Sequence, residues 1–322
     1  MNLSSNSAPN GTATCATVTN SGTIIVYVTV AIGCVSICES LVVIFVTWFT
    51  KSSQGNTNIY ILSLAVNDIL LVAAYLCNQL SVVSPGFFNL MKSQILTSLH
   101  FGLTSGTAFA SVEHMAVIAV DRYIQIAHPF YYMKAMTKTR TYIIALSLWI
   151  PCLICIIITP TVYYGDQYRT QCSLSVQATV YWYVGVTAYF IIVVMVFLCY
   201  FKIAHVAFKH KQSAISRKLR GSVSQADIET KENVTAAVRS VKFFALMFGV
   251  FFICTSPPYF GGIISLRFVI PEFISLWVFS LVPLSSIVNF VIYAFMNKEF
   301  TASMKNIILT MKRRCCEATG EM

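Results

Sequence analysis

The residues most able to do chemistry stand at the end of a long apolar segment. Asp121 and Arg122 lie side by side, followed by Tyr123, where a hydrophobic run that begins near Ile95 ends. Placing such an ion pair in hydrocarbon would be costly, so the pair should mark the point where a helix leaves the membrane. Arg122 would then meet the cytoplasm or a partner protein.

Enzymatic chemistry finds no matching pattern. No set of serine, histidine and aspartate has the spacing of a nucleophilic triad, and no cluster has metal-ligand spacing. No glycine-rich loop suits a phosphate group. The five histidines are scattered along the chain, at His100, His114, His128, His205 and His210. We therefore expect a protein that is not an enzyme and that has no resident cofactor.

The composition is that of a membrane protein. Of 322 residues, 57% are hydrophobic and 11% are charged, whereas a soluble domain is about 25% charged. This imbalance predicts a chain that crosses the membrane several times. Most of the eleven cysteines lie inside apolar runs, where we expect them to be small core residues.

Seven apolar segments are each near or above the ~20 residues that a spanning helix needs. We place them at 24–49, 58–83, 95–124, 141–163, 177–208, 236–266 and 272–295. Residues 1–23 then form a polar tail, and residues 296–322 form an amphipathic helix with a second tail. The predicted fold is an all-α membrane protein, a seven-transmembrane helix bundle with a short amphipathic eighth helix.

The distribution of basic residues predicts the orientation. With an extracellular N-terminus, only Lys92, Arg169 and Arg267 face outward, and the other nineteen of 22 lysines and arginines lie on the inner side. Such a positive-inside bias is typical of multi-pass membrane proteins and predicts a plasma-membrane protein with a cytoplasmic C-terminus. The net charge of +10 then faces anionic membrane lipids or a partner protein, and nucleic acid is not needed to explain it.

Both tails carry candidate modification sites. Asn2 and Asn10 stand in glycosylation triplets, although such triplets also arise by composition in a polar tail. Cys315 and Cys316 follow the amphipathic segment and a run of basic residues. Cysteines in this setting are candidates for palmitoylation, with free cytosolic thiols as the alternative.

Further motifs stand in register with Asp121-Arg122-Tyr123. Ile126 and Pro129 follow it, a Leu-Ala-Val-Asn-Asp run ends at Asp68, and Trp149 lies in the fourth segment. Together they resemble the rhodopsin-like (class A) G-protein-coupled receptors over residues 24–316. The resemblance implies a heterotrimeric G protein as partner. It also implies a coupling switch formed by Asp121, Arg122, Tyr123, Tyr200, Phe251, Pro257, Asn289 and Tyr293.

Several positions depart from the pattern of that family. Thr255 replaces the usual tryptophan of the sixth helix, and Ala237 stands where the family often has an acid. Ile192 and Phe290 replace prolines of the fifth and seventh helices; the first replacement also resembles the melanocortin, cannabinoid and lysophospholipid receptors. Thr97 replaces the cysteine of the usual disulfide. We therefore expect Cys15 to pair with Cys172, two unpaired thiols being the alternative.

Two carboxylates belong to the unusual chemistry. Glu39 replaces an asparagine of the family, and on the family's register it faces the bundle interior at the depth of Asp68, with Ser111, Ser285 and Asn289 nearby. Two neighbouring carboxylates in a low dielectric cannot both ionise cheaply. Three interpretations follow: the pair shares a proton, it holds a sodium ion more tightly, or it responds to pH. In the family, the aspartate commonly binds sodium.

The resemblance also implies a ligand pocket in the outer half of the bundle. Amine receptors carry an aspartate at the position of Thr104, so a protonated amine would lack its counter-ion here. A small or lipid-like ligand fits better. By register, the pocket residues are His100, Phe101, Thr104, Ser105, Tyr183, Thr255, Tyr259 and Phe279.

The departures favour a receptor that signals without a ligand. Ala237 removes one restraint on Arg122, and the small Thr255 replaces the tryptophan that in this family couples the ligand to movement of the sixth helix. Lowering the free-energy difference between the inactive and active states by ~1.4 kcal/mol raises the active-to-inactive ratio about tenfold. One alternative is a signalling-silent seven-helix partner of another receptor. A second is a small ion-coupled transporter that uses Glu39 and Asp68, although the chain lacks internal repeats.

Overall fold

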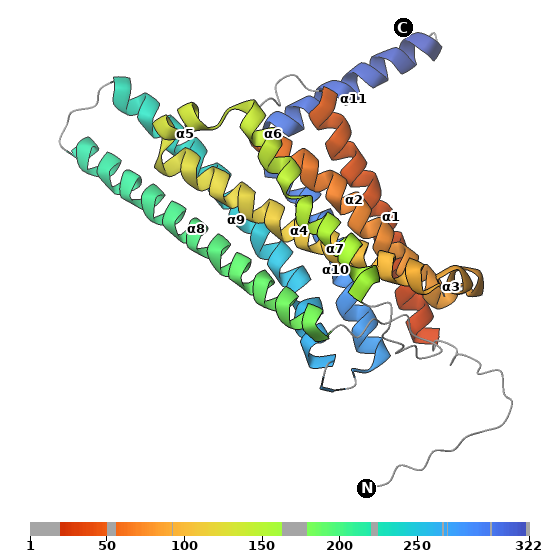
Figure 1. The fold of residues 1–322 in the computed structure, drawn as a ribbon. Helices are drawn as coiled ribbons and strands as arrows, with labels where there is room; N and C mark the ends of the chain where they lie inside the picture. Colours follow the sequence, from red (N-terminus) through yellow and green to blue (C-terminus); the bar gives the residue numbers. More distant parts are fainter. Residues whose placement is uncertain are drawn as a thin grey trace, which may run out of the picture.

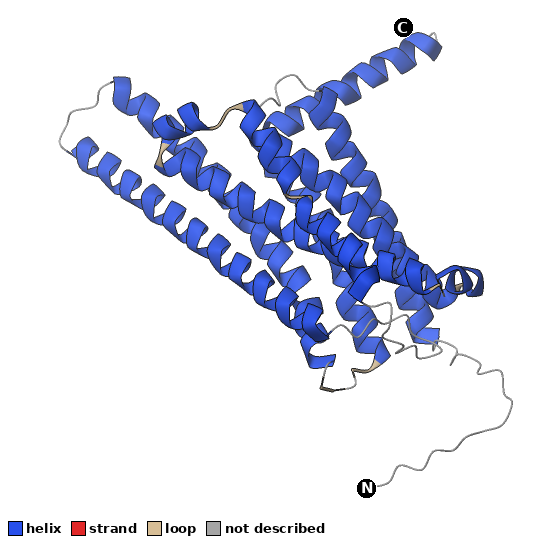
Figure 2. Cartoon of the chain, in the orientation of Figure 1, coloured by secondary structure: helices blue, strands red, loops and turns tan. Residues whose placement is uncertain are grey.

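The computed structural model describes residues 20–49, 56–91, 93–162, 179–219, 225–265, 267–268, 270–296 and 298–319. Long helices run side by side from one end of the bundle to the other (Figure 1). Every regular element of the described residues is an α-helix (Figure 2). The all-α class predicted from the sequence is therefore confirmed. The predicted positions Asn2, Asn10, Cys15 and Cys172 lie outside the described residues.

The long helices are α1, α2, α4, α8, α9 and α10, together with α6 and α7, which follow one another along a single path. Their bounds are Asn20–Phe49, Asn56–Val83, Gln94–Ala127, Thr179–Leu219, Gln225–Ser265, Glu272–Met296, Lys138–Ser147 and Ile150–Val162. Three further helices are α3 (Pro85–Met91), α5 (Pro129–Ala135) and α11 (Lys298–Thr319). α3 lies at one end of the bundle, and α5 and α11 lie at the other, called here the α5 end (Figure 1).

The lengths and outer faces of these helices suit a membrane. Within the described residues, six segments are long and apolar enough to span it, and α10 contributes a shorter apolar stretch, Ile274–Ile287. Large hydrophobic side chains such as Ile157, Val194 and Phe201 are more than half exposed on the outer surface. An exposed apolar surface of this size would be unfavourable in water, and it suits contact with lipid.

One predicted span is divided into two helices. The chain makes a turn at Leu148 and Trp149 between α6 and α7, and Pro151 follows directly. Because proline has no backbone N–H, it cannot continue the hydrogen-bond ladder to the carbonyl four residues before it. α6 and α7 therefore form one span, Lys138–Pro160, in which the helical hydrogen bonds are interrupted next to Trp149.

Helices α8 and α9 extend beyond the predicted spans. Each has 41 residues, although their apolar segments cover only Tyr183–Val206 and Ala245–Ser265. At 1.5 Å per residue, such helices are about 60 Å long, twice the ~30 Å of hydrocarbon. Both extra lengths project at the α5 end (Figure 1). The predicted spans 177–208 and 236–266 contain these apolar segments, and both helices continue past them because lysine, glutamine and alanine sustain a helix outside the membrane.

Helix α11 is amphipathic and packs on the bundle through its first turns. Phe300 is buried, and its ring meets that of Phe290 on α10 edge-on, with centroids 6.3 Å apart. Met304 and Ile307 pack on the same core. Ile308 is more than half exposed. α11 ends at Thr319, so the backbone of Cys315 and Cys316 belongs to it, while their side chains lie outside the described part of the chain.

Helix α4 occupies the centre and touches α2, α7, α8 and α9. Its closest contact with α7 uses two glycines one turn apart. A Cβ atom added at Gly102 would lie 2.8 Å from the carbonyl oxygen of Cys155, and one added at Gly106 would lie 2.8 Å from the Cα of Cys152. Lipid chains are as apolar as the helix surfaces, so the hydrophobic effect does not drive helices together inside a membrane. Small residues let the backbones approach closely, and van der Waals packing then holds the helices together. Gly102 and Gly106 therefore set the α4–α7 crossing.

Replacing Gly106 with alanine should destabilise the bundle. The new methyl group would meet α7 backbone, which cannot rotate away, and overpacking of this kind costs about 1–3 kcal/mol. We expect a lower melting temperature in detergent and less protein at the cell surface. Gly249→Ala is the matched control, because nothing lies within 4 Å of a Cβ added there. Equal melting temperatures for the two variants would contradict the close crossing.

Candidate functional site

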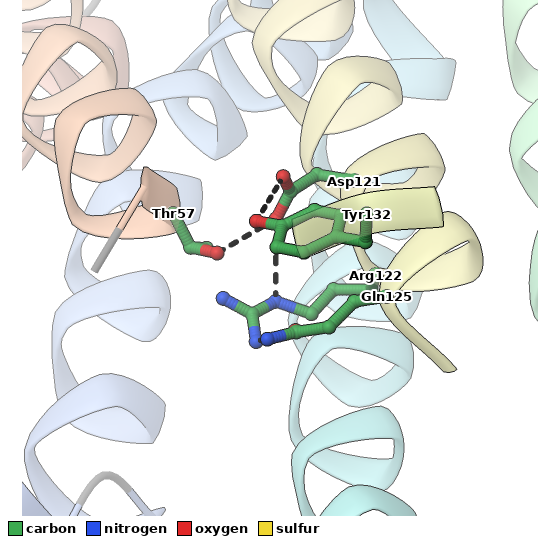
Figure 3. Close-up of polar contacts among 5 residues, drawn as sticks. All are labelled: Thr57, Asp121, Arg122, Gln125 and Tyr132. Carbon is green, nitrogen blue, oxygen red and sulfur yellow. Dashed lines mark hydrogen bonds and ion pairs between the residues drawn. The ribbon is translucent and has the colours of Figure 1, made fainter. Parts of the chain in front are cut away.

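The most connected polar site lies where α4 ends at the α5 end. The Asp121 side chain is buried, and both of its oxygens accept hydrogen bonds (Figure 3). Thr57 on α2 donates to Oδ2 at 2.7 Å, and Tyr132 on α5 donates to Oδ1 at 2.9 Å. The Nε atom of Arg122 lies 3.8 Å from Oδ2. A buried carboxylate requires such partners, so Asp121 joins the start of α2 and the α5 helix to α4.

Arg122 projects from α4 side by side with Gln125, which lies one turn further along the helix (Figure 3). Its Nη1 atom donates to Oε1 of Gln125 at 2.7 Å, and its side chain is 16% exposed (Figure 3). Asp121 and Gln125, the partners drawn there, both belong to α4. Tyr200 on α8 lies within electrostatic reach of the guanidinium. Two neighbours on its own helix therefore help to position the arginine.

Tyr132 is held as a hydrogen-bond donor. Burial of the phenol, followed by the charge of Asp121 and the hydrogen bond donated to it, raises the pKa of Tyr132 to about 12. A raised pKa favours the protonated form, so the hydroxyl keeps its proton at every pH below that value. Beside it, the Asn56 amide donates to the carbonyl oxygen of Met136 at 2.9 Å. The Tyr132 contact fastens α5 to the end of α4, and the Asn56 contact fastens the residue after α5 to the start of α2.

Tyr123 faces two basic side chains. The Nζ atom of Lys202 on α8 lies 5.9 Å from the centre of its ring, a cation–π distance. The ring of His128 meets it edge-on at 6.2 Å. Tyr123 therefore links α4 to α8 without touching the Asp121 carboxylate.

A second chain of hydrogen bonds crosses the bundle at Trp149. The indole Nε1 donates to Ser63 Oγ at 3.1 Å, Ser63 lies 2.8 Å from His114 Nε2, and His114 Nδ1 lies 2.6 Å from the Ala110 carbonyl oxygen. A carbonyl only accepts, so Nδ1 donates and the neutral ring accepts from Ser63 at Nε2. This chain joins α2, α4 and the α6–α7 turn.

The structure places Glu39 and Asp68 within electrostatic reach of each other. Both are 7% exposed, and the Oε1 atom of Glu39 has no hydrogen-bond partner. Ser111 and Ser286 face the Asp68 carboxylate. Ser285, which the sequence predicted here, instead donates to the Val282 carbonyl of its own helix at 2.7 Å. The two serines are adjacent on α10, and adjacent side chains on a helix point about 100° apart.

The predicted pocket residues of α4 are turned toward helix backbone. His100 Nε2 lies 2.7 Å from the Ala74 carbonyl oxygen on α2. Thr104 donates to the carbonyl oxygen of His100, and Ser105 to that of Phe101, at 2.9 and 2.7 Å. These hydroxyls are satisfied within α4. Their polarity therefore does not by itself indicate a ligand site.

The other predicted pocket residues divide into two groups. Tyr183 is 47% exposed on the outer face of α8, and Phe279 on α10 is half-buried. Thr255 and Tyr259, both on α9, are buried and meet Tyr189 of α8. The structure thus brings two of the eight predicted residues together around a tyrosine that the sequence reasoning missed. A tyrosine inside an apolar run is typical of a core residue. In the sequence, the sign of a polar partner for Tyr189 was the pair Thr255-Ser256, which stands before two prolines.

The remaining switch residues lie on α9 and α10. Phe251 is buried, and its carbonyl oxygen accepts the hydroxyl proton of Thr255 at 2.8 Å. Pro257 lies within α9. Asn289 and Tyr293 belong to α10, and their side chains lie outside the described part of the structure. Among the described residues, no group of three histidine, cysteine or acidic side chains could hold a metal ion.

A bundle of membrane-length helices with this polar cluster at the end of its central helix is a polytopic membrane protein of receptor architecture. Residues 39–300 match the family model described as 7 transmembrane receptor (rhodopsin family). The chain belongs to this family, whose members are receptors and cross the membrane seven times. The predicted seven-helix fold and the resemblance to rhodopsin-like G-protein-coupled receptors are confirmed.

Individual relatives are distant. The chain is 31% identical over 195 residues to the mouse protein named "Probable G-protein coupled receptor 101", a match over 58% of this chain and 37% of that receptor. It is 25% identical to mouse somatostatin receptor type 2, over 91% and 79% of the two chains. It is also 25% identical to rat melanocortin receptor 5, over 92% and 88%. The chain thus spans little more than a third of the first of these relatives.

Replacing Tyr132 with phenylalanine should loosen α5. The change removes a hydrogen bond to a charged group, worth about 1.5–3 kcal/mol, and keeps the ring. We expect amide hydrogen exchange in residues 129–135 to accelerate about tenfold or more, equally at pH 6 and pH 9, because the phenol does not titrate there. Tyr131→Phe is the control, since Tyr131 is 63% exposed. Unchanged exchange in Tyr132→Phe would contradict the tether.

Proposed function

We propose that this receptor activates heterotrimeric G proteins from its α5 end and does so appreciably without a ligand. Family membership supports coupling to G proteins in general. The observation that carries the finer proposal is the placement of Arg122. Asp121 and Gln125 hold it from its own helix, so these contacts do not tie α4 to α9.

Helix α9 offers no acid at the position where the family often has one. Ala237 stands there, in the part of α9 outside the apolar span. A methyl group cannot accept a hydrogen bond from a guanidinium. An outward movement of α9 at the α5 end therefore breaks no ion pair between Arg122 and this position. The barrier to the active arrangement is correspondingly lower.

The α5 helix supplies a surface for a partner. Phe130 is 83% exposed, Tyr131 63% and Met133 71%. All three lie outside the candidate membrane spans. Exposed apolar groups gathered on a short helix mark a protein interaction surface. The helix is anchored by Tyr132 to the Asp121 carboxylate beside Arg122, so a protein bound to α5 would lie next to the switch.

We assign the α5 end to the cytoplasm and the N-terminus to the outside. Exposed basic side chains at this end include Lys134, Lys138, Arg140, Lys202 and Lys209, and the positive-inside rule places them in the cytoplasm. With this orientation, Asn2 and Asn10 are available for glycosylation, Cys15 can pair with Cys172, and Cys315 and Cys316 can be acylated.

The ligand we propose is small or lipid-like and not an amine. Thr104 carries no charge, and its hydroxyl is bonded to the His100 carbonyl oxygen. A protonated amine would therefore find no carboxylate at this position of α4. A neutral ligand would lose nothing by the absence of a counter-ion.

The test is G-protein dissociation in cells across the four Gα families, without added ligand and at matched surface expression. We expect a basal signal from at least one family. Phe130→Ala should reduce it about fivefold or more, as for an interface residue worth over 1 kcal/mol. Phe268→Ala is the control, because Phe268 is 71% exposed and lies three residues after Ser265, the last residue of α9, away from the α5 end.

Each outcome decides one part of the proposal. A basal signal that Phe130→Ala lowers and Phe268→Ala leaves intact supports coupling through α5. No basal signal at good surface expression would contradict ligand-independent activity and would leave either a ligand-gated receptor or a signalling-silent partner of another receptor. Equal losses in the two variants would contradict the α5 surface.

A further inference from the structure

Helix α9 has a weak point in its middle. Pro257 and Pro258 lie inside it, and neither has a backbone N–H. The carbonyl groups of Ile253 and Cys254, four residues earlier, therefore lose their helical donors. Paired prolines of this kind are where a long helix bends. They divide α9 into a long segment, 225–256, which reaches the α5 end, and a short one, 259–265.

Tyr189 of α8 contacts both sides of this weak point. Its hydroxyl oxygen lies 3.0 Å from Thr255 Oγ1 and 2.8 Å from Ser256 Oγ, just before the prolines. Its ring stacks on Tyr259, just after them, with centroids 4.1 Å apart and planes 21° apart. Tyr189 is fully buried. One side chain thus joins α8 to both segments of α9.

The direction of each hydrogen bond in this group can be deduced. Thr255 donates to the Phe251 carbonyl oxygen at 2.8 Å, which can only accept. Its proton is then committed, so Tyr189 must donate to Thr255. The single proton of Tyr189 is in turn committed, so Ser256 must donate to Tyr189. All three hydroxyl protons are used once, and a satisfied buried chain of this kind specifies one arrangement.

We propose that Tyr189 is a clamp on the α9 hinge. Its hydroxyl holds the long segment of α9 against α8, while its ring remains stacked on the short segment. Release of the hydroxyl from Thr255 and Ser256 frees the long segment to pivot at Pro257. Thr255 stands where the family usually has a tryptophan, so this chain replaces a bulky contact with a hydrogen-bonded one. The link from hinge to signalling rests on the proposed function.

The clamp is tested by removing the hydroxyl and keeping the ring. The full receptor in lipid nanodiscs would carry spin labels, as non-canonical amino acids, at positions 209 and 242, the exposed sites of Lys209 on α8 and Lys242 on α9. Pulsed electron resonance measures their separation. We expect Tyr189→Phe to raise the population with α9 moved away about fivefold or more, because the phenol hydroxyl makes two neutral hydrogen bonds. Ser256→Ala should shift it in the same direction by less.

Tyr142→Phe is the matched control. Tyr142 lies on α6 and is 54% exposed, so loss of its hydroxyl should leave the distances unchanged. A distance distribution that is the same in Tyr189→Phe and wild type would overturn the clamp, as would an equal shift in Tyr142→Phe. G-protein dissociation measured on the same variants separates the two proposals. If Tyr189→Phe shifts the distances but does not increase G-protein dissociation, the proposed function alone is contradicted. If the wild-type receptor signals but Tyr189→Phe changes neither the distances nor the signal, the clamp alone is contradicted.

Discussion

The Asp121 carboxylate is a charge buried at the boundary of the hydrocarbon, and it requires partners from every side. It takes them from α2 through Thr57, from α5 through Tyr132, and from α4 through Arg122. Since a buried acid without such contacts would be costly, the start of α2, the end of α4 and the α5 helix are fixed together. The position of Arg122 and the surface of exposed apolar groups on α5 both follow from this one requirement.

The same constraint organises the interior, because lipid offers no hydrogen bonds to compensate a polar group. Ser63, His114 and Trp149 satisfy one another across three helices, and Tyr189 does the same with Thr255 and Ser256. These chains replace hydration by contacts between helices. Where packing alone holds two helices, as for α4 and α7, glycines bring the backbones together. The Tyr189 chain therefore ties α8 to α9, the helix that the proposed switch would move.

The helices could be predicted from the sequence because hydrophobic length is a local property. The Asp121–Arg122 pair could also be located, since its charges stand out against an apolar run. Its partners could not, because Thr57 and Tyr132 are ordinary residues until the fold brings them to Asp121. The smaller error at the carboxylate site came from helix register. The sequence predicted Ser285 there, whereas its neighbour Ser286 faces Asp68. Tyr189 was missed for the same reason, as its partners are 66 and 67 residues away.

Asp121 and Gln125 restrain Arg122 from its own helix, and Ala237 offers it no acid at the α9 position where the family often has one. Restoring an acid to α9 tests this directly. Basal G-protein dissociation would be compared in Ala237→Glu and in the neutral isostere Ala237→Gln, at equal surface expression. The account predicts that glutamate lowers the basal signal about fivefold, as for an ion pair worth about 1 kcal/mol, and that glutamine leaves it near wild type. Equal signals in the two variants would contradict it.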